Sequence, residues 1–137
     1  MRVSQKLEYA CRAMAQLAKQ ADAKTITRLD EIAQREDISS NFLVQILNDL
    51  RRSGLVSSKR GKLGGYLLAQ KADEISLFDI VQSVEPNLLD DTTVSEGSSG
   101  SGVNKAWKKA GAVFSAHLKQ TTLSTLIEDE DTPMFYI

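Results

Sequence analysis

Residues 38–68 read ISSNFLVQILNDLRRSGLVSSKRGKLGGYLL, and this stretch decides the fold. Its first half repeats apolar residues at the three- and four-residue steps of one helical face, namely Leu43, Ile46, Leu47 and Leu50. Ser39 or Ser40 can cap the N-terminus of this helix, and Gly54 suits the left-handed position after its end. The pattern therefore predicts a helix between the serines and the glycine.

A shorter helix is predicted just before this one. Residues 28–36 turn three apolar side chains inward, Leu29, Ile32 and Ala33. Two short helices joined by three or four residues are a helix-turn-helix candidate. Residues 24–27 are β-branched and suit a small strand, and the apolar stripe from Leu7 to Ala21 predicts a further helix capped by Ser4.

Two strands are predicted after the helix-turn-helix, Leu55–Ser58 and Tyr66–Ala69. The tip between them, residues 59–65, carries three cations and three glycines. A hairpin directly after a helix-turn-helix is the order of a winged helix. The predicted fold class is mainly α with a small β-hairpin wing: a winged helix-turn-helix followed by a long dimerisation helix.

The second half of the chain is organised around that long helix. Ser76 caps a helix that ends before Pro86, and Gly97–Gly102 has the composition of a flexible linker. The next helix has one apolar face, formed by Val103, Trp107, Ala110, Phe114 and Leu118. The predicted units are a winged helix-turn-helix domain (1–86), a flexible loop (87–102), a dimerisation helix region (103–128) and a C-terminal tail (129–137).

The composition excludes several classes of protein. The 137 residues are 42% hydrophobic and 26% charged, which suits one compact domain, and no stretch has the roughly 18 apolar residues of a membrane span. The N-terminus has no apolar signal core, so we expect a cytoplasmic protein. One cysteine and one histidine argue against an internal disulfide and structural zinc. No nucleophile–base pair or phosphate loop indicates an enzyme.

Charge is divided unevenly between the two halves of the chain. Residues 1–71 hold 13 Lys and Arg against 7 Asp and Glu, a net charge of +6, whereas residues 72–137 hold 4 against 11, a net charge of −7. The basic half predicts contact with a polyanion. Five cations and no acid lie between Arg51 and Lys62, where phosphate contacts would make DNA binding sensitive to salt. A solvated charged turn is the alternative.

The polar face of the helix predicted between Ser39 and Gly54 can contact DNA bases. Its outward residues are Asn41, Gln45, Asn48 and Asp49. Asn and Gln suit bidentate contacts to adenine in the major groove. The alternative is a plain helical hairpin with a polar outer face. The candidate DNA-binding residues are Ser39, Ser40, Asn41, Gln45, Asn48, Arg51, Lys59, Arg60, Lys62, Gly64, Gly65 and Tyr66.

Several motifs match one bacterial family. They are SQKLEYACRAM at 4–14, ISSNFL at 38–43 with Ile46, Leu47, Leu50 and Arg51, GLV at 54–56, and RGKLGGYLL at 60–68. In these motifs the chain resembles the winged-helix regulators typified by IscR, NsrR and CymR, over nearly its whole length. The resemblance implies a homodimer on a near-palindromic operator, with the recognition helix in the major groove and Lys59, Arg60 and Lys62 in the minor groove. The apolar face of the long helix is wide enough to serve as core or as dimer surface, and in a palindrome-reading protein a dimer surface at Trp107, Phe114 and Leu118 is favoured.

The chain departs from this family in the ligands for iron. Iron–sulfur members bind their cluster through three cysteines in the loop before the long helix, and residues 88–102 contain none. Such clusters require thiolates, so Asp90, Asp91 and Glu96 are poor substitutes. Glu8 stands where some members place an acidic fourth ligand, and without thiolates we assign it a structural or polar surface role. We predict no cofactor and no metal.

The last four residues narrow the resemblance to CymR, a cluster-free repressor of cysteine metabolism that acts with cysteine synthase. These candidate partner-binding residues are Met134, Phe135, Tyr136 and Ile137. The resemblance implies a repressor of cysteine or sulfur genes whose partners are double-stranded DNA, a second copy of itself and cysteine synthase. Packing of the tail on the chain's own domain or its dimer mate is one alternative. Others are a redox- or small-molecule-responsive regulator using Cys11, and an enzyme-binding protein acting through Ile137.

Overall fold

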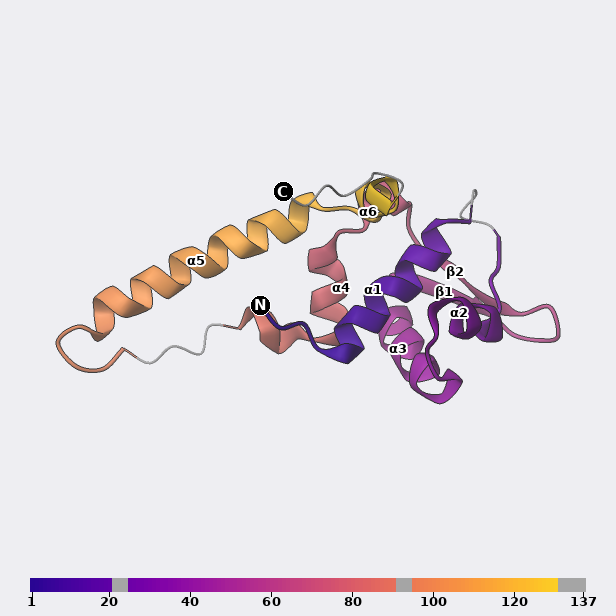
Figure 1. Ribbon diagram of the computed structural model, residues 1–137, viewed down its shortest axis with the longest axis horizontal. Helices are drawn as coiled ribbons and strands as arrows, with labels where there is room; N and C mark the ends of the chain where they lie inside the picture. Colours follow the sequence, from indigo (N-terminus) through magenta and orange to yellow (C-terminus); the bar gives the residue numbers. More distant parts are fainter. Residues whose placement is uncertain (21–24, 91–94, 131–137) are drawn as a thin grey trace, which may run out of the picture.

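The computed structural model describes residues 1–20, 25–90 and 95–130 and shows a helical body from which one long helix extends (Figure 1). The α-helices in these residues are α1 (Gln5–Ala18), α2 (Leu29–Glu36), α3 (Ser40–Arg52), α4 (Leu77–Val84), α5 (Gly100–Gln120) and α6 (Leu123–Glu130). The strands β1 (Val56–Lys59) and β2 (Gly65–Leu68) form an antiparallel hairpin, and the short 3-10 helices η1 (Ala72–Glu74) and η2 (Pro86–Leu89) flank α4. The predicted fold class is confirmed.

Serine caps fix where three of the helices begin. Ser4 and Ser39 each accept a hydrogen bond from the backbone N–H three residues later, at 3.1 and 3.3 Å. Ser76 and Asp79 form a capping box at the start of α4. These side chains satisfy amides that have no partner within the helix. The predicted helix starts are confirmed, and Ser39 rather than Ser40 is the cap of α3.

The wing is a short hairpin that is attached to the segment before α2. Val56 of β1 lies opposite Leu68 of β2. Thr27 and Tyr66 exchange two backbone hydrogen bonds of 2.8 Å, so the segment before α2 adds an isolated bridge rather than the small strand predicted over residues 24–27. The wing therefore has two attachments to the body. The chain connects β1 directly to α3, and the bridge connects β2 to Thr27.

One hydrophobic core holds the body together. It is built from the apolar faces of α1, α2, α3 and α4, and its largest fully buried apolar residues are Met14, Ile32, Leu43, Ile46, Leu47, Leu50, Ile75, Ile80 and Leu123. Leu118 of α5 and Leu123 of α6 belong to the same core, and α6 packs against α1. The far end of the chain therefore returns to the body.

Helix α5 differs in two ways from the predicted organisation. It begins at Gly100 rather than at Val103, because helical hydrogen bonding extends back into the glycine-rich segment. Its C-terminal end is attached to the start of α4 by an antiparallel bridge between Ser76 and Thr122, so α6 is part of the body rather than of a separate region over 103–128. In the part of the chain that the structure describes, no helix has the length and apolar character to cross a membrane.

Candidate nucleic-acid interface

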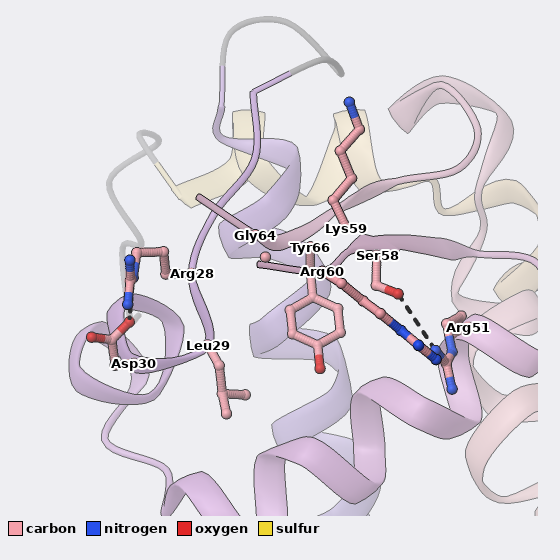
Figure 2. Close-up of a pocket in the computed structure, with 10 residues that line it drawn as sticks. Arg28, Leu29, Asp30, Arg51, Ser58, Lys59, Arg60, Gly64 and Tyr66 are labelled. Carbon is pink, nitrogen blue, oxygen red and sulfur yellow. Dashed lines mark hydrogen bonds and ion pairs between the residues drawn. The ribbon is translucent and has the colours of Figure 1, made fainter. Parts of the chain in front are cut away.

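A cleft of about 460 Å³ lies between the wing and the helix-turn-helix (Figure 2). The start of α2, the C-terminal end of α3 and both strands of the wing line it. Four of its lining residues are cations, Arg28, Arg51, Lys59 and Arg60, and one is an acid, Asp30. A concave surface with this excess of positive charge favours the approach of a phosphate backbone.

Arg28 holds the wing against the start of α2. Its Nη1 donates a hydrogen bond to the backbone carbonyl of Lys62 at 2.8 Å, and its Nε lies 3.4 Å from Oδ1 of Asp30. The bond to Lys62 fixes the wing tip relative to the helix-turn-helix, so Arg28 is a positioning residue as well as a cation of the cleft. No local sequence pattern reveals this role of Arg28, because its contact joins residues 34 positions apart.

The end of α3 and the wing carry the predicted cations. Lys59, Arg60 and Lys62 are all exposed, as the prediction of wing contacts requires. Nη1 of Arg51 reaches the Oγ of Ser58 at 3.4 Å, which connects the end of α3 with β1 (Figure 2). Arg51, Lys59 and Arg60 all line the cleft, with Lys59 directed away from Arg51 in Figure 2, and with the exposed Lys62 they can neutralise phosphates.

Two of the three wing glycines, Gly64 and Gly65, have a structural role, although we predicted that they contact DNA. A Cβ on Gly64 would lie 2.2 Å from the carbonyl oxygen of Lys59, and a Cβ on Gly65 would lie 2.5 Å from the carbonyl oxygen of Thr27. Both distances are far inside van der Waals contact, so the backbone of the wing packs this closely only because these residues are glycine. Tyr66 is half-buried, with its ring in the cleft (Figure 2).

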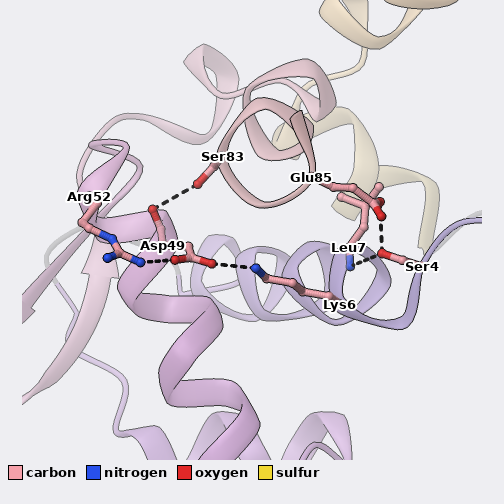
Figure 3. Close-up of polar contacts among 7 residues, drawn as sticks. All are labelled: Ser4, Lys6, Leu7, Asp49, Arg52, Ser83 and Glu85. Carbon is pink, nitrogen blue, oxygen red and sulfur yellow. Dashed lines mark hydrogen bonds and ion pairs between the residues drawn. The ribbon is translucent and has the colours of Figure 1, made fainter. Parts of the chain in front are cut away.

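The outer face of α3 is partly engaged by ion pairs. Asp49 points toward α1, where its Oδ2 lies 2.8 Å from Nζ of Lys6, and its Oδ1 contacts the guanidinium of Arg52 (Figure 3). The hydrogen bond from Lys6 is the main reason that the pKa of Asp49 lies below its usual value of 3.8. Asp49 is thus bound within the protein, contrary to its predicted outward position. The remaining predicted residues are exposed, Ser39, Ser40, Asn41 and Gln45, or half-buried, Asn48.

The three predicted dimer residues lie in different environments. Trp107 is 64% exposed, whereas Leu118 is 8% exposed and Phe114 is half-buried against the body. Leu118 is therefore used in the chain's own core and is not free to contact a second copy, which corrects that prediction. Among the 21 residues of α5, all of them described, Leu118 is the one buried residue. The N-terminal part of the same apolar face, with Val103 and Trp107, is exposed.

Cys11 is a protonated, half-buried thiol. Burial, together with the nearby carboxylate of Glu8, raises the pKa of the Cys11 thiol to about 11. A thiol becomes a good nucleophile when its pKa falls, so this environment opposes reaction with oxidants. The geometry favours a packing role for Cys11 over the redox alternative.

Comparisons with known proteins identify relatives across nearly the whole chain. The family model described as "Rrf2: Iron-dependent Transcriptional regulator" matches residues 3–129. A putative HTH-type transcriptional regulator of Mycobacterium tuberculosis is 38% identical over 129 residues, which cover 90% of this chain and 80% of the relative. The HTH-type transcriptional regulator IscR of Cereibacter sphaeroides is 37% identical over 141 residues, which cover 97% and 91% of the two chains.

Solved structures with the same fold include members of two regulator types. The global cysteine regulator CymR of B. subtilis matches with a TM-score of 0.81 and 30% identity, over 93% of this chain and 97% of that one. IscR of T. potens matches with a TM-score of 0.78 and 31% identity, over 100% and 93% of the two chains. These matches confirm the winged-helix fold and the predicted resemblance.

The family description names iron, but the ligands that this chain offers do not fit an iron–sulfur cluster. Such clusters are held by several cysteine thiolates, and the whole sequence contains one cysteine, Cys11. The thiol of Cys11 also holds its proton up to a pKa of about 11. Within residues 1–20, 25–90 and 95–130, no group of three or more His, Cys, Asp and Glu side chains could hold a metal ion.

Proposed function

The chain belongs to the Rrf2 family of winged-helix transcriptional regulators, and from this premise we propose that it acts as a homodimer on a near-palindromic operator. It is a DNA-binding regulator and not an enzyme. In the proposed complex α3 lies in the major groove and the wing lies in the adjacent minor groove. Regulation does not use an iron–sulfur cluster, because the chain lacks the thiolates for one.

The observation that carries this proposal is the cleft between α3 and the wing, which is lined by four cations and one acid. Lys59, Arg60 and Lys62 project from the hairpin, and Arg28 fixes the position of the tip. The exposed Asn41 and Gln45 lie on the same helix as Arg51 and are polar residues that can reach base edges. Phosphate contacts set the register of such a protein on the duplex, and base contacts supply the sequence preference.

Replacing the three wing cations tests the DNA assignment. In Lys59→Ala/Arg60→Ala/Lys62→Ala, operator affinity should fall, and the slope of log affinity against log salt should become less steep by up to about 2.7, at about 0.9 per lost phosphate contact. The measurement is DNA binding by fluorescence anisotropy between 50 and 200 mM salt, the range in which such contacts dominate.

A triple variant with the same loss of charge serves as the control. Lys71→Ala/Lys105→Ala/Lys109→Ala removes three exposed lysines outside the wing and the cleft. Its salt dependence should match that of the wild type. An unchanged affinity and slope in the wing variant, measured beside this control, would show that the wing does not contact DNA.

The uncovered apolar face of α5 supports the homodimer. Val103 and Trp107 continue the face that Phe114 and Leu118 present to the body, so one helix has a packed end and an exposed end. A second copy of α5 related by a two-fold axis would cover the exposed end, and a two-fold dimer matches a near-palindromic site.

We also propose that the protein represses genes of cysteine or sulfur metabolism. In this proposal it acts in a complex with the enzyme cysteine synthase. The fold's likeness to a global cysteine regulator and the absence of cluster ligands in the sequence support this assignment. The partner-binding residues Met134 to Ile137 lie outside the described residues, so their role stays a prediction. A pull-down with purified cysteine synthase, using the full chain and a variant without Ile137, tests this role. Equal capture of both would contradict a role for Ile137.

A further inference from the structure

A row of polar side chains along α3 ends with the cation Arg52. Asn41, Gln45 and Asn48 lie on the face that the proposed function directs toward the bases. Arg52 follows at the next four-residue step, and at about 100° per residue these four positions fall within an arc of about 60°. The side chain of Arg52 is 72% exposed. By position, Arg52 belongs to the DNA-facing stripe.

Asp49 holds this cation on the side of α3 that faces α1. Its carboxylate contacts the guanidinium of Arg52 through one oxygen and lies 2.8 Å from Nζ of Lys6 through the other (Figure 3). The side chain of Asp49 is 20% exposed, whereas those of Lys6 and Arg52 are 40% and 72% exposed, so a partly buried acid holds two solvent-accessible cations. One acid therefore pairs with two cations, Arg52 at the end of α3 and Lys6 of α1, and the three side chains together keep a net charge of +1.

The surroundings of Asp49 keep it in this position. The Oγ of Ser83 in α4 donates a hydrogen bond to the backbone carbonyl of Asp49 at 3.1 Å, and the Oγ of Ser4 donates to Glu85 at 3.0 Å (Figure 3). Helices α1, α3 and α4 are thus joined by polar contacts at this end of the body. The carboxylate is presented to Lys6 and Arg52 by a fixed backbone.

We propose that Asp49 is a specificity-determining residue that keeps Arg52 and Lys6 from binding phosphates and so limits sequence-independent binding of DNA. This inference rests on the proposed function. A long, unpaired arginine on the reading face can reach a phosphate in any register of the duplex. Contacts of that kind supply most non-specific affinity and carry no sequence information. By occupying Arg52, Asp49 leaves recognition to the shorter side chains of α3.

The test compares binding to an operator duplex and to a scrambled duplex of equal length. In Asp49→Asn, which keeps the shape of the side chain, affinity for the scrambled duplex should rise by about 3- to 10-fold at low salt. Its salt dependence should become steeper by about 0.9 to 1.8, for one or two new phosphate contacts. The ratio of operator to scrambled affinity should fall. Asp90→Asn removes one acid at an exposed position outside α3 and the wing, and it should leave both duplex affinities unchanged.

Two further variants separate this role from a merely structural one. In the Arg52→Gln background, Asp49→Asn should lose most of its effect on scrambled-duplex affinity, since the released cation is missing. Arg52→Gln alone should change that affinity less than 2-fold, because Arg52 is already paired. If Asp49→Asn fails to fold, Arg52→Gln still tests the inference, because a large loss of affinity would show that Arg52 binds phosphate in the wild type.

Three results would overturn the inference: a scrambled-duplex affinity that does not rise in Asp49→Asn, a rise that Asp90→Asn reproduces, or a large loss of affinity in Arg52→Gln alone. In each of these cases the wild type still binds its operator, so the proposed function stands. A wild type that binds no duplex at low salt would overturn the proposed function together with this inference.

Discussion

The winged-helix body and helix α5 differ in the exposure of their apolar side chains. In the body, apolar residues from α1 to α4 meet in one core and are almost completely buried. In α5 the apolar face continues past the body, and Val103, Trp107 and Val113 are exposed. The body is specified by contacts within the chain, whereas α5 needs a second surface to cover it. Substitutions in the two regions should therefore have different consequences.

Truncation of a core residue should produce the largest effect. Leu47 of α3 is fully buried, so Leu47→Ala should lower the free energy of unfolding by about 2–5 kcal/mol through lost burial and a residual cavity. Val113 of α5 is 65% exposed, and Val113→Ala should change the free energy of unfolding by less than about 0.5 kcal/mol. Urea denaturation measures both. Similar losses in the two variants would show that α5 is covered in the single chain.

Truncation of the exposed tryptophan should affect association rather than folding. Large aromatic residues dominate the energy of interfaces, so Trp107→Ala should weaken dimerisation by at least about 30-fold, corresponding to about 2 kcal/mol. Sedimentation velocity over a range of concentrations measures the change. The far-ultraviolet circular dichroism of the body should remain that of the wild type. Lys109→Ala, an exposed position on the opposite side of α5, is the control. A wild-type chain that is monomeric at all concentrations would contradict the dimer.

The smallest expected effect concerns the reactivity of Cys11, whose thiol lies on the packed side of α1. The pKa of Cys11 is raised to about 11, so at pH 8 iodoacetamide should modify the folded protein much more slowly than the urea-unfolded protein, and the rate should climb toward pH 11. The folded pKa lies above the usual 9.0, so the stability that Cys11 contributes is complete below pH 9 and is lost between pH 9 and about 11. Rapid modification at pH 8 would restore the redox alternative.

Local sequence patterns predicted most of the fold. Helical periodicity and serine caps at Ser4, Ser39 and Ser76 predicted the helices of the body, because these signals act within one or two turns. The wing cations were predicted for the same reason, since charge and turn residues are adjacent in the chain. The start of α5 was less predictable, because the glycines before Val103 have poor helix propensity and still join the helix.

The contacts that position the candidate site could not be predicted from local patterns. Arg28 reaches the wing across 34 residues, and the Asp49 carboxylate finds Lys6 from a different helix. Gly65 is required because Thr27 approaches it, a proximity that exists only in the folded chain. Leu118 followed the same periodicity as Trp107, and periodicity alone cannot tell an apolar face that meets the body from one that meets a partner.

The attachment of α5 at its C-terminal end also has a mechanical consequence. Next to the bridge between Ser76 and Thr122, the N–H of Leu77 donates to the carbonyl of Thr121, and the N–H of Leu123 donates to the carbonyl of Ile75, both at 2.9 Å. The helix is therefore a lever of 21 residues, about 32 Å long, clamped at one end. A tilt of about 5° at the clamp moves the free end by about 3 Å. In the proposed dimer, the stiffness of these few hydrogen bonds limits how far the distance between two half-sites can vary.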